Sequence, residues 1–448
     1  AAPLISHLMS KELPRQLGLK DAVGILVGSV IGSAIFKVTA TMTQDVHTPA
    51  MVLAVWVVGG IISFMGGVTF AELGTRFPEP GGMYVYLRMA FGPMVAFLYG
   101  WSLFLVIQTG SIAAVAAAFA DYFTVMTGLA ESLRPLIAVV LIAFLTTTNA
   151  LSTRLGANVQ NISSLVKCLA VVGLIVVCLT SSKATFTHFR PVVTDSLSLA
   201  FVLAIGNALV SSLWAYDGWY QVGNIAGELE NPERDVPRSL FLGLSIVCVL
   251  YILVSIAYLT VLPPAEVAKS TAIAADTAFA VWGDTGRTLI SLAVVISTFG
   301  CVNGMTISGP RVYYAMSRDG ALPAFLGSAH PRFLTPFWAI VLQGIWSANL
   351  VLVGKYDQLF NYVMFVGWVF YALAGIALFL ERRKHPDAVC YRAWGFPYTT
   401  GGFVLASLFL FVTTFWNYRR ESLTGCVILA VGAFVFWLRT PMGAGKGA

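Results

Sequence analysis

Charge is scarce in this sequence. Asp, Glu, Lys and Arg make up only 11% of its 448 residues, whereas 58% are hydrophobic. A soluble domain carries about a quarter of its residues charged, so this composition excludes a water-soluble enzyme or binding protein. The mean hydropathy of +0.81 leads to the same conclusion. The chain is therefore expected to be an all-α polytopic membrane protein with the lipid bilayer as its main neighbour.

Cysteine and histidine are also few, and their spacing indicates no special chemistry. Five of the six cysteines fall in predicted spans and Cys390 lies alone in a loop, so no disulfide framework is expected. The five histidines are scattered over tails and loops without metal-ligand spacing. The spans hold no His, Cys and carboxylate cluster typical of an enzyme, and no repeated filter or charged ring typical of a channel. We expect no metal site and no cofactor.

Long apolar windows recur along the whole chain. A segment needs about 20 apolar residues to cross roughly 30 Å of hydrocarbon. Such windows are centred near residues 31, 62, 107, 143, 172, 210, 250, 298, 345, 370, 406 and 430. The sequence therefore predicts about twelve spans in a single transmembrane domain, 1–448, with no soluble domain.

Lys and Arg concentrate in alternate loops. An even number of spans places both termini on one side, and the loops on that side hold the larger share of basic residues, Arg76, Arg154 and Arg311 among them. Cytoplasmic loops carry this excess in membrane proteins. We therefore expect a multi-pass protein of the cell (inner or plasma) membrane with cytoplasmic termini, and the net charge of +6 needs no nucleic acid to explain it.

Two spans are interrupted by helix-breaking residues. The first is broken around Gly32 to Ala34, and the sixth is broken in "SLWAYDGWYQVGN", where Asp217 and Gly218 divide an apolar run. Broken segments at matching places in two halves are typical of inverted-repeat transporters with a binding site at mid-membrane. Close helix packing is the alternative for the small residues alone, and the spacing from Gly28 to Gly32 fits it. Asp217 favours a site, because a carboxylate inside a span is costly without a partner.

The two breaks together suit a zwitterion. A broken helix frees N–H groups at the start of one half and carbonyl groups at the end of the other, and N–H groups at a helix start attract anions. Donors for a carboxylate are expected at Ser33 and Ala34. Acceptors for an ammonium group are expected at the carbonyls of four residues: Val30, Ile31, Trp214 and Asp217.

Two more residues in the spans call for an explanation. Trp214 lies beside the second break and has a rigid face that can close over a substrate, although a Trp within a span also serves as core or interface. Lys167 lies about a dozen residues into the fifth span, which is expected to begin near Leu155. Snorkelling to a headgroup is difficult from this depth, so a structural or functional partner is expected.

Five motifs in this order resemble the amino acid-polyamine-organocation superfamily, and specifically its L-amino acid transporter branch, which contains the light chains of heteromeric transporters and their bacterial homologues. The likeness covers nearly the whole chain. The motifs are "GSVIGSAIF" (28–36), "AELGTRFPEPGGMYVYL" (71–87), "LWAYDGW" (213–219), "GELENPERDVPRS" (227–239) and "SGPRVYYAMSRDGALPAFL" (308–326).

The resemblance implies a LeuT-like fold with helices 1 and 6 broken. By this likeness the chain divides into a cytoplasmic tail (1–18), a first repeat of five helices (19–180), an inverted second repeat of five (196–382) and two extra helices (397–439). It also implies a sodium-independent exchanger of small or medium neutral L-amino acids that works by alternating access. Such a protein is a transporter and not an enzyme.

The resemblance also implies roles for individual residues. The backbone of Gly32, Ser33 and Ala34 matches the motif that binds the substrate carboxylate, and the carbonyls of Val30, Trp214 and Asp217 match those that take the amino group. Trp214 matches the aromatic gate. Lys167 matches a lysine that occupies the place of sodium in sodium-coupled relatives, so we expect it to donate to carbonyls between Gly28 and Gly32 and to the eighth span near Cys301.

Four residues depart from the usual family pattern, and one of them, Thr39, replaces a proline that is common just after the motif. Ala34 replaces a glycine, so its Cβ either strains a positive φ, at a cost of about 1 kcal/mol, or narrows the pocket. Lys37 follows the motif and is expected as a rim charge near the outer end of its span. Asp217 stands where several members have Gly or Ser, and it either pairs with a cationic substrate or is satisfied by nearby Ser, Tyr or Lys side chains. A proton-coupled or cationic amino acid carrier that uses Asp217 is therefore the alternative function.

The family's light chains hold a heavy chain through a cysteine between their third and fourth spans. The corresponding stretch here, "TVMTGLAESLRP" (124–135), has no cysteine. We therefore expect no disulfide-linked heavy chain, and small L-amino acids as the partners that this protein binds.

Overall fold

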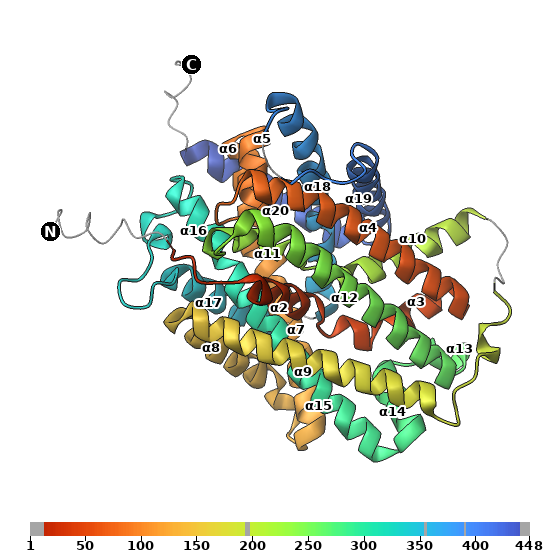
Figure 1. The fold of residues 1–448 in the computed structure, drawn as a ribbon. Coiled ribbons are helices and arrows are strands. Elements are labelled where there is room, and N and C mark those ends of the chain that lie inside the picture. The colour runs from red at the N-terminus through yellow and green to blue at the C-terminus, as the bar shows by residue number, and fades with distance from the viewer. Residues whose placement is uncertain (1–12, 193–197, 354–355, 389–390, 440–448) are drawn as a thin grey trace.

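The computed structural model describes residues 13–192, 198–353, 356–388 and 391–439 (Figure 1). Part of the predicted N-terminal tail (1–12) and Cys390 lie outside these ranges. The described chain is helical throughout, and its extended pairing is limited to one bridge between Leu17 and Leu229. This result confirms an all-helical polytopic architecture.

The described chain is a succession of α-helices. In chain order they are α2 (Leu19–Val30), α3 (Val38–Val46), α4 (Pro49–Arg76), α5 (Met83–Phe91), α6 (Pro93–Ser102), α7 (Gln108–Thr127), α8 (Arg134–Leu151), α9 (Thr153–Thr180), α10 (Leu199–Tyr216), α11 (Gln221–Asn224), α12 (Pro232–Val261), α13 (Pro264–Val267), α14 (Ile273–Trp282), α15 (Asp284–Ser308), α16 (Pro310–Arg318), α17 (Phe337–Val353), α18 (Tyr356–Lys384), α19 (Tyr398–Asn417) and α20 (Arg419–Arg439).

Ten helical segments in the described chain are long and apolar enough to cross a membrane. The broken first span, made of α2 and α3, and the seventeen-residue α17 add two more candidates. This total agrees with the twelve spans that the sequence predicts. In Figure 1, α2 lies in the middle of the bundle, where it packs against α9, α12 and α15.

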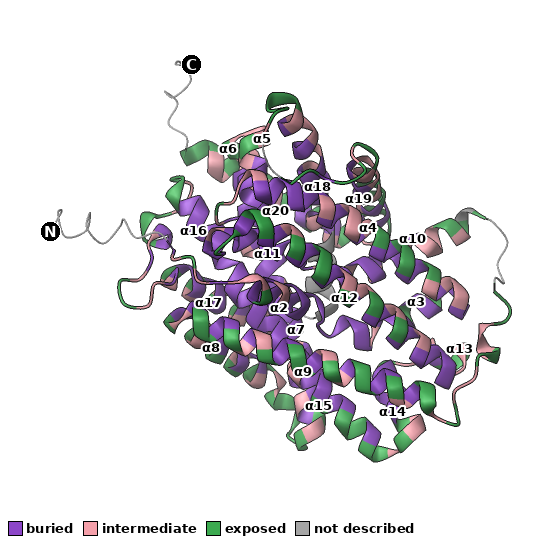
Figure 2. Ribbon diagram, viewed as in Figure 1, coloured by how far each residue is buried: buried purple, intermediate pink, exposed green. Residues whose placement is uncertain are grey.

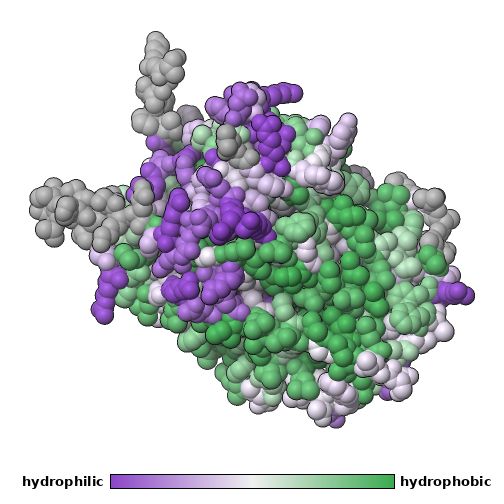
Figure 3. Space-filling view, viewed as in Figure 1, coloured by the Kyte–Doolittle hydropathy of each residue, from purple (hydrophilic) through white to green (hydrophobic). Residues whose placement is uncertain are grey.

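The outward faces of the bundle are apolar. Ile162 and Leu165 on α9 are 66% and 61% exposed, and Figure 2 shows exposed residues along the outer sides of α8, α9 and α12. Figure 3 shows a broad hydrophobic surface over these helices, with hydrophilic residues gathered at the end near α16 and α5. Lipid is the environment in which such a surface is stable.

The first span breaks because its backbone leaves the helical conformation after Val30. Ile31 has ψ 88°, residues 31–33 form a bend, and a 3₁₀ turn, η1 (Ala34–Phe36), leads into α3. Lys37 directly precedes α3, which continues for nine more residues. The expectation of a rim charge near the outer end of this span was therefore wrong, because Lys37 lies at the break itself.

The sixth span breaks where α10 ends at Tyr216. Asp217 is extended, with ψ 152°, and Gly218 has φ +109°, a conformation that favours glycine because a Cβ clashes there. A Cβ on Gly218 would also lie 3.4 Å from the Ser29 carbonyl oxygen. Gly218 therefore allows the sixth span to turn and the backbones of the two broken spans to approach each other.

A buried ion pair joins three spans at the charged end. Arg311 on α16 lies 2.5 Å (Nε to Oε1) and 3.1 Å (Nη2 to Oε2) from Glu228, which follows the sixth span in the 3₁₀ turn η5 (Ala226–Glu228), and it also donates to Thr153 Oγ1 at 3.1 Å. Both charged side chains are 1% exposed or less. The sequence placed Arg311 among loop charges, which was wrong because it is a buried helical residue.

Removing one member of this pair should destabilise the fold more than removing both. Arg311→Met leaves the Glu228 carboxylate buried without its partner, and we expect a loss of about 3–5 kcal/mol in stability. The double variant Arg311→Met with Glu228→Met should recover much of this loss. The thermal unfolding temperature of the detergent-solubilised protein tests this ranking. Glu131→Gln is the control: it removes a carboxylate of a surface ion pair whose side chain is 79% exposed, and it should change the unfolding temperature little. A double variant no more stable than Arg311→Met would contradict this account.

Candidate functional site at the two helix breaks

A small cavity of about 40 Å³ lies between the two broken spans. The first span, the segment around the second break, α7 and α15 all contribute to its wall. The lining residues are Ser29, Val30, Gly32, Ser33, Ala34, Ser111, Val115, Trp214, Asp217, Gly218, Tyr220, Gln221, Cys301 and Met305. The structure thus brings together the two sequence motifs, which are about 180 residues apart in the chain.

Free hydrogen-bond donors meet this cavity at the first break. Among the described residues, the backbone N–H groups of Ser33 and Ala34 make no hydrogen bond. The buried hydroxyl groups of Ser29 and Ser33 also have no protein partner there. Buried polar groups are normally satisfied, so these donors suit a polar ligand. Ala34 lies in η1 and is not among the residues with positive φ, so its methyl group narrows the cavity without straining the backbone.

The predicted acceptors already take part in hydrogen bonds to different extents. The Val30 oxygen accepts from Gly32 N at 2.9 Å and lies 3.1 Å from the Tyr251 hydroxyl. The Ile31 oxygen accepts from Lys167 Nζ at 2.7 Å and from Ser297 Oγ at 3.0 Å. A carbonyl has two lone pairs, so both lone pairs of Ile31 are used. At the second break, the Trp214 carbonyl accepts from Asp217 N at 3.1 Å.

Lys167 is fully buried beneath the first break. Its Nζ donates to the carbonyls of Gly28 (2.8 Å), Ile31 (2.7 Å) and Ser297 (3.1 Å). One ammonium group thereby joins α9 to the end of α2 and to α15, one helical turn before Cys301. The Cys301 thiol donates to the Ser29 carbonyl at 3.0 Å. The ammonium group has three donors, and each of them is used.

Gly28 and Gly32 lie close to neighbouring side chains. A Cβ on Gly28 would lie 1.5 Å from the Gln160 amide nitrogen, and one on Gly32 would lie 3.0 Å from Cys301 Sγ. Close helix packing therefore explains Gly28, which contacts α9. Gly32 lines the cavity as well, so a methyl group there would crowd Cys301 and narrow the access to the backbone.

Tyr251 on α12 was missed by the sequence reasoning. Its hydroxyl group lies 3.1 Å from the Val30 carbonyl and 2.9 Å from the Ala215 carbonyl, and its single proton can serve either one. The residue therefore links the last turn before each break. A tyrosine in the middle of an apolar run gives no spacing signal, so only the packing of α12 against both breaks reveals it.

Asp217 has a side-chain partner on the tenth span. The Tyr371 hydroxyl on α18 donates a hydrogen bond to Asp217 Oδ1, and Tyr371 itself is 7% exposed. The sequence left Ser, Tyr or Lys as alternatives for this role, and the structure selects a tyrosine. Trp214 is half-buried on the cavity wall.

Comparison with known proteins agrees with these features. The family model for amino acid permeases matches residues 17–438. The b(0,+)-type amino acid transporter 1 of Mus musculus is 31% identical over 96% of this chain and 89% of its own length. The serine/threonine exchanger SteT of Bacillus subtilis is 32% identical over 84% of this chain and 86% of its own length. The human cystine/glutamate transporter is 28% identical over 96% of this chain and 87% of its own length.

These relatives are transporters and not enzymes, and their alignments extend over nearly the whole membrane domain. The predicted resemblance is confirmed by the family match and by identities above 30% over most of the chain. The chain therefore belongs to the amino acid permease family, in the L-amino acid transporter branch of the amino acid-polyamine-organocation superfamily.

Proposed function

We propose that this protein is a sodium-independent exchanger of small or medium neutral L-amino acids, working by alternating access in the cell membrane with both termini in the cytoplasm. The observation that carries the proposal is the cavity between two opposed helix breaks. Relatives whose names include a serine/threonine exchanger support exchange as the mode of transport.

The polar groups around the cavity match the two charges of an amino acid. The free N–H groups of Ser33 and Ala34 stand at the start of the outer half of the first span and can hold a carboxylate. The carbonyls of Trp214 and Asp217 at the end of α10 can accept from an ammonium group. Ile31 contributes less to this second contact, because Lys167 and Ser297 already donate to its carbonyl.

Lys167 supports independence from sodium. Its ammonium group is already bonded to carbonyls of the first and eighth spans. A second cation there would meet like charge at short range, where the repulsion is strong in a medium of low dielectric constant. We therefore assign Lys167 the structural place that a bound cation would otherwise fill.

The bond from Tyr371 favours neutral substrates over cationic ones. The phenol donates to Asp217 and reduces the capacity of the carboxylate to hold a substrate ammonium or guanidinium group. The alternative, a proton-coupled or cationic carrier using Asp217, requires that this bond be broken or exchanged. Because the 124–135 segment lacks cysteine, we further propose that the protein works without a disulfide-linked heavy chain.

Exchange can be measured directly in liposomes. Labelled alanine or serine should enter liposomes loaded with unlabelled alanine, and entry into liposomes without internal amino acid should be at background. Adding an inward sodium gradient should leave the rate unchanged. Uptake into empty liposomes would overturn exchange, and stimulation by sodium would overturn the assignment of Lys167.

Lys167→Met should reduce the exchange rate by roughly tenfold or more. The change keeps much of the side-chain volume but leaves the Gly28 and Ile31 carbonyls without their ammonium donor, and a buried unsatisfied group costs about 1–3 kcal/mol. Exchange is measured alongside Lys20→Met, which alters an exposed lysine on α2 and should behave as wild type. Equal rates in the two variants would remove the proposed role of Lys167.

Tyr371→Phe should raise arginine uptake relative to alanine uptake severalfold, because it frees the Asp217 carboxylate for a cationic side chain. Adding Asp217→Asn should return the ratio to its starting value. Tyr313→Phe is the matched control, since it removes a buried hydroxyl group that has no partner among the described residues. If Tyr371→Phe leaves the ratio unchanged, Asp217 has no part in side-chain recognition. A wild-type protein that prefers arginine to alanine would instead favour the alternative function.

A further inference from the structure

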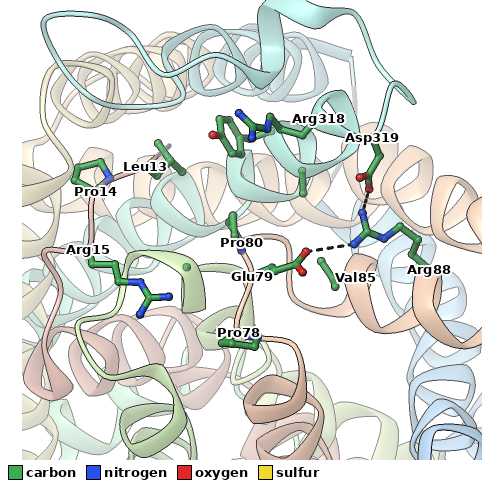
Figure 4. A pocket seen from close by; sticks show the side chains of 13 residues that line it. Leu13, Pro14, Arg15, Pro78, Glu79, Pro80, Val85, Arg88, Arg318 and Asp319 are labelled. Atoms are coloured by element: carbon green, nitrogen blue, oxygen red, sulfur yellow. Dashed lines mark hydrogen bonds and ion pairs between the residues drawn. The ribbon is translucent and has the colours of Figure 1, made fainter. Parts of the chain in front are cut away.

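A second and larger cavity opens at the charged end of the molecule. Its volume is about 680 Å³, and it shares no residue with the cavity between the helix breaks. The lining comes from the segment before α2, the loop after α4, α5, η5 and the end of α16 (Figure 4). Small-molecule sites commonly measure about 300–1,000 Å³, so this cavity is large enough for a metabolite.

The walls of this cavity are held by specific contacts. The N–H groups of Gln16 and Leu17 both donate to the Glu228 carbonyl at 3.0 Å, and Glu230 N donates to the Leu17 carbonyl at 2.9 Å. A Cβ on Gly227 would lie 2.4 Å from Pro80 Cδ, so the loop after α4 is packed directly on η5. The cavity is therefore formed by segments fixed to one another.

The charges in the cavity are unevenly paired. Arg88 contacts both carboxylates of the lining, Glu79 at 3.2 Å and Asp319 (Figure 4), and the Tyr84 hydroxyl also donates to Asp319 at 2.9 Å. Arg15 and Arg318 have no carboxylate within ion-pair distance in the described part of the chain. Three guanidinium groups thus face two carboxylates, and the two carboxylates are engaged by the same arginine.

We propose that this cavity binds a small organic anion. Arg15 and Arg318 supply guanidinium groups whose geometry suits a phosphate or a carboxylate. Pro78, Pro80 and the ring of Tyr314 supply the apolar wall for the rest of the molecule. The lining carries one more positive than negative charge, so an anion is favoured over a neutral molecule of the same shape.

Binding there would join segments that belong to different spans. Arg15 leads directly into α2, the inner half of the first span, whereas Arg318 ends α16, the continuation of the eighth span. An anion held by both would tie α2 to α16 and restrain the movement of one relative to the other. This regulatory consequence rests on the proposed transport function, whereas the binding site does not.

Binding can be tested on the purified protein without transport. Calorimetric titration with adenosine monophosphate and with citrate distinguishes a phosphate from a carboxylate ligand. Adenosine, which lacks the phosphate of adenosine monophosphate, is the uncharged control. We expect at least one of the two anions to bind and adenosine to bind at least about tenfold more weakly. Arg15→Gln and Arg318→Gln should each weaken anion binding by roughly tenfold, whereas Arg238→Gln, an exposed arginine outside the lining, should not.

The outcomes separate this proposal from the transport function. Absence of binding by both anions at millimolar concentration, or equal binding by wild type and by both cavity variants, overturns the anion site. Retained exchange in liposomes by the Arg15 and Arg318 variants verifies that they are folded. If adenosine monophosphate or citrate binds but does not slow exchange when present at the charged face, the site stands and the regulatory consequence is wrong. Loss of exchange in every protein, wild type included, contradicts only the proposed function.

Discussion

The arrangement of the site depends on one buried ammonium group. Lys167 extends from α9 to the carbonyls of Gly28, Ile31 and Ser297, and these bonds satisfy a charge that a lipid bilayer would otherwise exclude. The same bonds satisfy carbonyl groups that the end of α2 leaves without helical partners. A break in a spanning helix is thus stabilised by a charge, and the charge is stabilised by the break. Either one alone would be costly in a medium without water.

The site is built mostly from backbone, and side chains from other spans hold that backbone in place. Tyr251 lies within hydrogen-bond distance of the carbonyls of Val30 and Ala215, one from each broken span. Ser297 and Cys301 on α15 bind further carbonyls of the first span. These groups bind carbonyls at the end of α2, whereas the N–H groups of Ser33 and Ala34 at the same break make no hydrogen bond in the described part of the chain.

The charged end is organised by a different principle. Arg311 and Glu228 form a buried pair with several hydrogen bonds, and neither residue lines the inner cavity or the larger cavity near Arg15 and Arg318. Buried pairs add little net stability over apolar packing but are costly to break singly. The pair therefore holds the ends of three spans together, because its hydrogen bonds join the fifth, sixth and eighth spans. The two cavities differ in chemical character, since one lies between the two helix breaks and the other among the charged residues near α5 and α16.

The sequence by itself determined the membrane environment, the number of spans, the two breaks and the depth of Lys167, because hydropathy and helix-breaking residues act locally and each span must satisfy its own backbone. Five ordered motifs also determined the family.

Only the tertiary structure decided which carbonyls remain available, that Tyr371 is the partner of Asp217, that Arg311 is buried and that Lys37 lies at a break. The burial of Arg311 and the partner of Asp217 depend on contacts between residues far apart in the chain, Arg311 with Glu228 and Tyr371 with Asp217, and no spacing in a single chain encodes them. Ala34 illustrates the difference: its identity is visible in the sequence, but whether its methyl group strains the backbone or narrows the cavity depends on the φ angle and on the facing helix.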